Sequence, residues 1–116
     1  MSSERKKELQ AQFKQMKPEM GIFAVINTHN NKCFLETTQN LKGKMNSVSF
    51  QLRSGGHPNK ELQKDWQKFG EAGFKTVVLE QIEYENDETK TNYSEELQLL
   101  KMIWCEKLTK DNKQFY

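Results

Sequence analysis

The chain has 116 residues, about a third of them apolar, which is enough for one domain with a single core and too little for two ordinary domains. No apolar run approaches the roughly 20 residues of a membrane-spanning helix, and no apolar stretch follows the charged start, so the sequence predicts a soluble cytoplasmic protein. Cys33 and Cys105 show no CxxC pairing, which excludes a zinc knuckle or a dithiol redox motif.

The first predicted element is a short helix within residues 1–18. Leu9, Phe13 and Met16 fall on one helical stripe, and Pro18 follows the end of the pattern closely. We expect residues 1–18 to be a helical extension of the domain. Its apolar stripe either covers the domain's own core or meets a partner protein.

A β-hairpin is predicted next, from two β-prone runs, "GIFAVIN" and "CFLETT". The segment between them, "THNNK", contains consecutive asparagines, which tolerate the left-handed backbone of a tight turn. From Asn40, a good helix N-cap, apolar residues recur at helical spacing as far as Leu52. The glycines and proline of "RSGGHP" end that helix, and His57 in this loop is expected to order the next helix rather than bind a metal.

The second half of the chain predicts helix, strand and helix in that order. Leu62, Trp66 and Phe69 share one stripe, with Gly70 as a natural stop. The run "FKTVVLEQI" predicts a third strand, and "ENDETKTN" predicts a polar loop. A last helix is predicted to begin near Ser94, because two glutamates follow there and negative side chains are favourable at the N-terminal end of a helix dipole. Its expected buried stripe is Leu97, Leu100, Trp104 and Leu108.

Two short motifs and two longer segments make the chain resemble the GIY-YIG nuclease domain, which occurs in homing endonucleases, in a bacterial excinuclease and in many small bacterial proteins. Gly21-Ile22-Phe23 stands where the family has Gly-Ile-Tyr, and Phe34-Leu35-Glu36 stands where it has Tyr-Ile-Gly. The segment "HPNKELQKDWQKFGEAGFKTVVLE" and the final "LLKMIWCEKL" resemble later family segments. The resemblance covers Gly21 to Tyr116. It implies an α/β (α+β) fold over residues 19–116, with a three-stranded antiparallel sheet flanked by helices.

The resemblance also implies that the groups of the two hairpin motifs have been replaced. Phe23 and Phe34 stand at two tyrosine positions, and the first tyrosine is thought to act as the general base. A phenylalanine has no hydroxyl proton to take or give. Glu36 stands at a glycine that lets the backbone approach the substrate closely, and its carboxylate would lie beside a phosphate.

The later positions of the family pattern differ in the same way. Lys44 and Val48 stand where the first domain helix has arginine and histidine, and Tyr116 stands near a late asparagine. The glutamate that holds the family's divalent metal falls at Lys101, whose ammonium group cannot ligate Mg²⁺. These replacements predict a catalytically inactive domain with no metal site and no cofactor.

Charge is distributed unevenly along the chain, although the net charge is only +2. From residue 32 to residue 75 there are eight basic side chains against four acidic ones, whereas residues 76–116 have five lysines against nine carboxylates. Such an asymmetry either attracts a polyanion to one side or is an ordinary mixed surface. The nucleic-acid-binding residues that we predict are Lys32, Lys42, Lys44, Arg53, Lys60 and Lys64.

The sequence therefore predicts a catalytically inactive domain that binds nucleic acid, DNA rather than RNA, weakly and mainly through phosphates. A role in transcription regulation is conceivable on that basis. Nothing resembles the base-reading helix of a helix-turn-helix. One alternative is a protein-interaction module that uses the N-terminal helix or the acidic half. Another is an Mg²⁺-dependent endonuclease in which Glu36 and Glu106 are relocated metal ligands.

One structural expectation concerns the inactive site itself. The family's arrangement would bring the replaced positions together and leave Lys44 and Lys101 as two uncompensated positive charges. We therefore expect Glu36 to lie within salt-bridge distance of one or both lysines. If it does not, an anion-binding pocket is the alternative.

Overall fold

The computed structural model describes residues 17–116, so the predicted helix of the 1–18 extension, whose apolar stripe ends at Met16, lies outside the described residues. No helix of residues 17–116 is long and apolar enough to cross a membrane. The elements, in chain order, are β1 (Met20–Asn27), β2 (Cys33–Thr38), α2 (Leu41–Ser54), α3 (Lys60–Phe69), the 3₁₀ turn η1 (Glu71–Gly73), β3 (Phe74–Ile82) and α4 (Ser94–Lys110).

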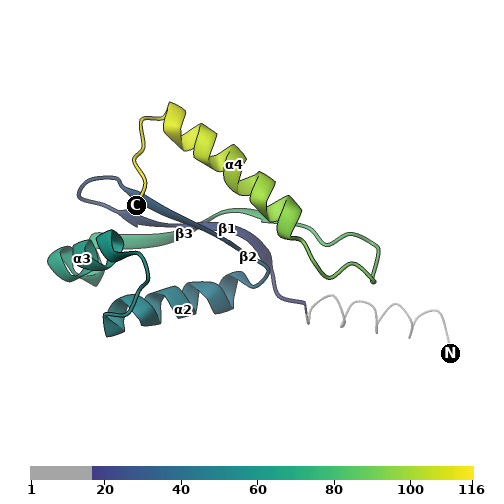
Figure 1. Cartoon of the computed structure of the whole chain (residues 1–116), viewed down its shortest axis with the longest axis horizontal. Coiled ribbons are helices and arrows are strands. Elements are labelled where there is room, and N and C mark those ends of the chain that lie inside the picture. Colours follow the sequence, from purple (N-terminus) through teal and green to yellow (C-terminus); the bar gives the residue numbers. More distant parts are fainter. Residues whose placement is uncertain (1–16) are drawn as a thin grey trace.

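The three strands form one antiparallel sheet in the order β2-β1-β3, which confirms the predicted α+β architecture. Helices cover both faces of this sheet, with α2 and α3 on one side and α4 on the other (Figure 1). Because successive side chains of a strand point to opposite faces, β1 contributes to two separate cores. Ile22 and Ala24 face α4, whereas Phe23 and Val25 face α2 and α3.

Each core is built from buried side chains of one sheet face and the helices that cover it. Burial of these apolar side chains is the main source of stability for both layers. The core beneath α4 contains Met20, Ile22, Ala24, Leu35, Tyr93, Leu97 and Leu100. The core beneath α2 and α3 contains Phe23, Val25, Leu41, Val48, Leu52 and Leu62.

The helix boundaries on the α2 and α3 side follow the predicted capping residues. The side chain of Asn40 accepts a hydrogen bond from the Gly43 N–H, and α2 ends at Gly55 in a left-handed conformation with φ of 82°. The side chain of Asn59 caps α3 by accepting from the Leu62 N–H, and Gly70 ends that helix. These caps fix where the loop between the two helices begins and ends.

The backbones of β1 and β3 approach each other closely at Gly21. A Cβ atom placed on Gly21 would lie 2.0 Å from the carbonyl oxygen of Glu80 and 2.8 Å from the Cα of Gln81. Both atoms belong to the main chain of β3, so neither can move without displacing the strand. Only glycine fits this position of the sheet.

A C-terminal strap, residues 113–116, runs along the outer edge of β2. The Cys33 N–H donates to the Gln114 carbonyl at 2.9 Å, and the Tyr116 N–H donates to the Cys33 carbonyl at 3.0 Å. The Tyr116 hydroxyl then donates to the Asp65 carboxylate at 2.7 Å and accepts from the Asn27 side-chain amide at 2.9 Å. The strap thus joins the end of the chain to α3 and to the hairpin.

Candidate functional site

A pocket of about 290 Å³ lies between α2, β2 and the loop that joins α2 to α3. Phe34 and Glu36 come from β2, where alternation turns both toward α2. One stripe of α2, with spacing i, i+4 and i+7, supplies a second wall. The complete lining is Phe34, Glu36, Lys44, Val48, Gln51, His57, Pro58 and Asn59.

The loop wall of the pocket is held in place by the side chain of Gln63. Gln63 is 8% exposed; its amide nitrogen donates to the Leu52 carbonyl at 3.0 Å, and its amide oxygen accepts from the His57 N–H at 2.9 Å. One side chain of α3 thereby provides a hydrogen-bond partner for a carbonyl in the last turn of α2 and for an N–H of the loop. His57 is consequently fixed in the wall, and its ring makes an edge contact with Phe34 at 5.1 Å.

His57 is a neutral imidazole in this environment. It is 7% exposed, and its Nδ1 accepts a hydrogen bond from the Asn59 N–H at 3.0 Å. Burial lowers the pKa of His57 below its ordinary value of 6.5, since a desolvated imidazolium is unfavourable. His57 therefore helps order the start of α3, as predicted, and its Nδ1 is occupied by the backbone.

The lowered pKa of His57 predicts a pH dependence of stability. The unfolded chain takes up a proton near 6.5 while the folded chain does not, so the free energy of unfolding falls as the pH drops below that value and until the lowered pKa is reached. We expect His57→Gln to flatten this dependence between about pH 7.5 and about pH 5.5 in denaturant titrations. An exposed residue of α3 that does not titrate provides the control, because Gln67→Leu should leave the slope unchanged.

The expected salt bridge of Glu36 is not formed. Glu36 and Lys44 line the same pocket, yet within residues 17–116 no ion pair at 4.0 Å or less involves Glu36, Lys44 or Lys101. The prediction of a salt bridge is therefore wrong: Glu36 of β2 and Lys44 of α2 share the pocket without pairing. Lys101 is exposed on α4, which covers the other face of the sheet (Figure 1).

The replaced family positions therefore converge only in part. Phe34, Glu36, Lys44 and Val48 line one pocket. Phe23 is fully buried in the core beside them, and neither Lys101 nor Tyr116 belongs to the lining. Sequence reasoning missed the contribution of Gln51, although its seven-residue spacing from Lys44 indicates the same face of α2.

Tyr116 contributes to the strap rather than to the pocket. The pKa of Tyr116 is raised to about 12, mainly by burial and in part by the nearby Asp65 carboxylate. The phenol is therefore protonated at neutral pH, which its hydrogen bond to Asp65 requires. Lys32 lies 5.5 Å from the centre of the Tyr116 ring, so the strap also meets the base of the hairpin turn.

The six predicted nucleic-acid-binding residues divide into two groups. Lys32 forms an ion pair with Glu61, and Arg53 forms one with Glu71, its Nε lying 3.1 Å from the carboxylate. These two cations are partly neutralised. By contrast, the ion pairs found within residues 17–116 do not include the remaining four, Lys42, Lys44, Lys60 and Lys64.

The alternative of an Mg²⁺-dependent endonuclease with Glu36 and Glu106 as metal ligands requires these side chains to meet in one cluster. Across the described residues no three His, Cys, Asp or Glu side chains come together as a metal site would require. Glu36 faces the pocket beside α2, whereas Glu106 is exposed on α4 on the opposite side of the sheet. The structure therefore does not bring these two carboxylates into one site.

Comparison with known proteins finds similar structures but no match by sequence. No protein-family model matches the chain, and no curated protein matches it by sequence. A structure of the catalytic domain of homing endonuclease I-TevI covers 83% of this chain and 96% of that domain at 26% identity, with a TM-score of 0.64. A mutant of the catalytic domain of intron endonuclease I-TevI covers 84% and 92% at 22% identity, with a TM-score of 0.66. I-TevI is a GIY-YIG homing endonuclease, so this chain has the fold of a GIY-YIG catalytic domain.

Proposed function

We propose that this domain binds nucleic acid, DNA rather than RNA, through phosphates on the α2 and α3 side of the sheet, without cleaving it. The observation that carries the proposal is the group of four lysines, Lys42, Lys44, Lys60 and Lys64, that have no ion-pair partner in residues 17–116. They lie on two helices that cover the same face in the fold of an endonuclease catalytic domain. Ammonium groups without a carboxylate partner can neutralise phosphates and so release the counterions condensed on the nucleic acid. This release favours association with any sequence.

The pocket chemistry supports binding without cleavage. Phe34 and Val48 offer neither a proton nor a hydrogen bond, and the buried Phe23 has no hydroxyl. The single carboxylate in the lining, Glu36, would repel a phosphate placed deep in the pocket. Phosphates are therefore expected to contact lysines at the rim, with Lys44 as the innermost contact.

Binding assays with charge-neutralised variants test this proposal. We expect the double variants Lys42→Gln/Lys44→Gln and Lys60→Gln/Lys64→Gln each to weaken binding of unrelated DNA duplexes at least about tenfold at about 50 mM salt. The slope of log K against log salt should become shallower by about 0.9 for each phosphate that the variant no longer neutralises. Fluorescence anisotropy with duplex DNA, single-stranded DNA and RNA across a salt series measures both quantities.

A matched control removes the same charge from the opposite side of the sheet. Lys107→Gln/Lys110→Gln on α4 should change affinity much less than either double variant. In the same samples, DNA incubated with Mg²⁺ or Mn²⁺ should stay intact. Absence of binding at low ionic strength would overturn the proposal, and metal-dependent cleavage that disappears in Glu36→Ala would establish the relocated-ligand enzyme instead.

A further inference from the structure

Helix α4 has a second apolar surface on the side that faces away from the sheet. Leu97 and Leu100 are buried against the sheet, whereas Leu99, Met102 and Ile103 are 58%, 57% and 40% exposed. Leu99 lies two residues from Leu97, which places it about 200° round the helix axis. Because α4 covers its face of the sheet from outside (Figure 1), these three side chains lie on the outer surface of residues 17–116.

One row of this surface has opposite charges at its two ends. Glu95, Leu99, Ile103 and Lys107 follow one another at four-residue spacing, so they form a single ridge along the helix. We call these four residues the outer ridge of α4. All four are exposed, with Glu95 in the first turn of the helix and Lys107 in the last.

The outer ridge is complementary to itself when two copies run antiparallel. Glu95 then faces Lys107 of the second copy, and Leu99 faces Ile103 of the second copy, because both pairs of positions are centred on position 101. A two-fold axis repeats each of these contacts, since the same surface is used by both copies. A parallel pair would instead oppose carboxylate to carboxylate and ammonium to ammonium, which charge disfavours.

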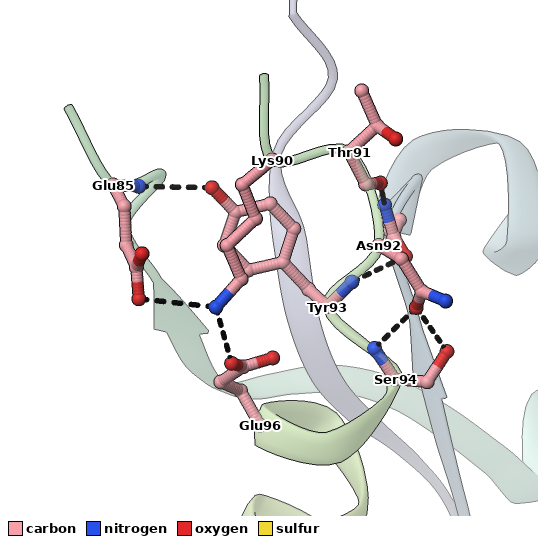
Figure 2. A network of polar contacts seen from close by, with 8 residues as sticks. Glu85, Lys90, Thr91, Asn92, Tyr93, Ser94 and Glu96 are labelled. Atoms are coloured by element: carbon pink, nitrogen blue, oxygen red, sulfur yellow. Dashed lines mark hydrogen bonds and ion pairs between the residues drawn. The ribbon is translucent and has the colours of Figure 1, made fainter. Parts of the chain in front are cut away.

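The polar network at the start of α4 distinguishes the two glutamates of its first turn (Figure 2). Glu96 bonds to the Lys90 ammonium at 2.5 Å, and Lys90 also bonds to Glu85 at 3.1 Å. The Tyr93 hydroxyl joins this network by accepting from the Glu85 N–H at 2.9 Å. Glu96 is thus neutralised within its own chain, whereas the ion pairs found within residues 17–116 do not include Glu95.

Lys107 is the matching cation at the other end of the outer ridge. Among residues 17–116 it has no ion-pair partner, and its ammonium lies 4.7 Å from the centre of the Trp104 ring on the same helix. Glu106 and Lys110 lie beside this end, four residues apart, a spacing at which opposite charges on one helix attract each other. Their charges largely offset one another, so Lys107 sets the charge at this end of the ridge.

We propose that two copies of the chain associate through the outer ridges of α4, packed antiparallel about a two-fold axis. Leu99 and Ile103 of each copy form the apolar centre with Met102 beside it, and an ion pair between Glu95 and Lys107 flanks it at each end. One helix face buries less than the roughly 800 Å² per partner of a standard interface, so we expect a dissociation constant of about 0.1–1 mM. The proposal is independent of nucleic-acid binding, because α2 and α3 lie on the opposite face of the sheet (Figure 1).

Analytical ultracentrifugation of the full chain, without nucleic acid, tests the association. From about 10 µM to about 1 mM protein, at about 50 mM salt, we expect the average mass to rise toward that of a dimer. Glu95→Lys and Lys107→Glu should each weaken self-association about tenfold, because each places like charges opposite one another at both ends of the interface. Circular dichroism should show the parent helix content in both variants, since both positions are exposed.

A mixture of these two variants tests the antiparallel pairing itself. When one copy of each variant pairs, the new lysine faces the new glutamate, and the unchanged Lys107 faces the unchanged Glu95. The mixture should therefore associate about as tightly as the parent chain, although neither variant does so alone. Ile103→Gln should weaken association in every combination, because it removes the apolar centre.

The matched control is Lys68→Glu, which makes the same charge change in the last turn of α3, on the other side of the sheet. It should leave self-association unchanged. The proposal is overturned if the mass stays that of a monomer up to about 1 mM, or if Glu95→Lys and Lys107→Glu leave the association intact. Two variants that each lose association and do not regain it on mixing would also overturn it.

Discussion

Gly21→Ala is expected to destabilise the domain by about 3 kcal/mol, the upper part of the range for an overpacked site. The new methyl group would lie 2.0 Å from the Glu80 carbonyl oxygen, a distance that non-bonded atoms do not tolerate. Because the nearest atoms belong to the main chain of β3, relief requires the two strands to separate at a point where Gly21 pairs with Gln81. Urea unfolding of the variant should show a lower midpoint than the parent protein.

Gly56→Ala is the matched control for this prediction. A Cβ on Gly56 would meet nothing closer than the Ser54 hydroxyl at 3.9 Å, so we expect a change of at most about 0.5 kcal/mol. Equal losses of stability in the two variants would contradict the steric explanation. Gly21 belongs to the first of the two hairpin motifs and lies in the buried part of the sheet. A loss of stability in Gly21→Ala alone would therefore assign this motif glycine a role in packing the sheet.

Gln63→Leu is expected to cost about 2–4 kcal/mol, although leucine is similar in size and more apolar than glutamine. The substitution leaves the Leu52 carbonyl and the His57 N–H without a partner in a buried place, and each orphaned group costs about 1–3 kcal/mol. The added apolar side chain offsets part of that loss. Denaturant titration measures the change in the free energy of unfolding.

A substitution on the exposed side of the same helix serves as its control. Gln67→Leu makes the same substitution as Gln63→Leu, but at an exposed side chain. The free energy of unfolding should therefore change by no more than about 0.5 kcal/mol. Hydrogen exchange adds a local measurement, because the His57 amide should exchange faster in Gln63→Leu. An unchanged His57 exchange rate would show that the Gln63 amide does not hold the loop.

The secondary structure could be predicted from the sequence because local signals and tertiary contacts agree. Asn40 and Gly70 mark a helix start and a helix end through their own hydrogen bonds and backbone preferences, independently of what the helices pack against. The run from Phe74 to Ile82 is predicted as a strand from its residue types and is one. The 3₁₀ turn before it is not predicted, since three residues carry too weak a pattern.

The candidate site could be predicted only in part, because its composition depends on which face each element presents. The resemblance to the GIY-YIG domain implies that Phe34, Glu36 and Lys44 share one region, and they do. The sequence does not show that α4 covers the opposite face, which keeps Lys101 out of the pocket. Nor does it show the pairing of Arg53 with Glu71, two residues 18 positions apart in sequence.

The C-terminal strap also limits how the sheet can meet other chains. In a sheet ordered β2-β1-β3, the outer strands offer unpaired backbone groups to any extended segment, a common start of aggregation. At Cys33 both groups are already bonded within the molecule, so that position of the β2 edge is closed to intermolecular strand addition. Along β3, the register shift beside Phe23 and the charges of Lys75 and Glu80 provide a different defence, because an irregular, charged edge pairs poorly.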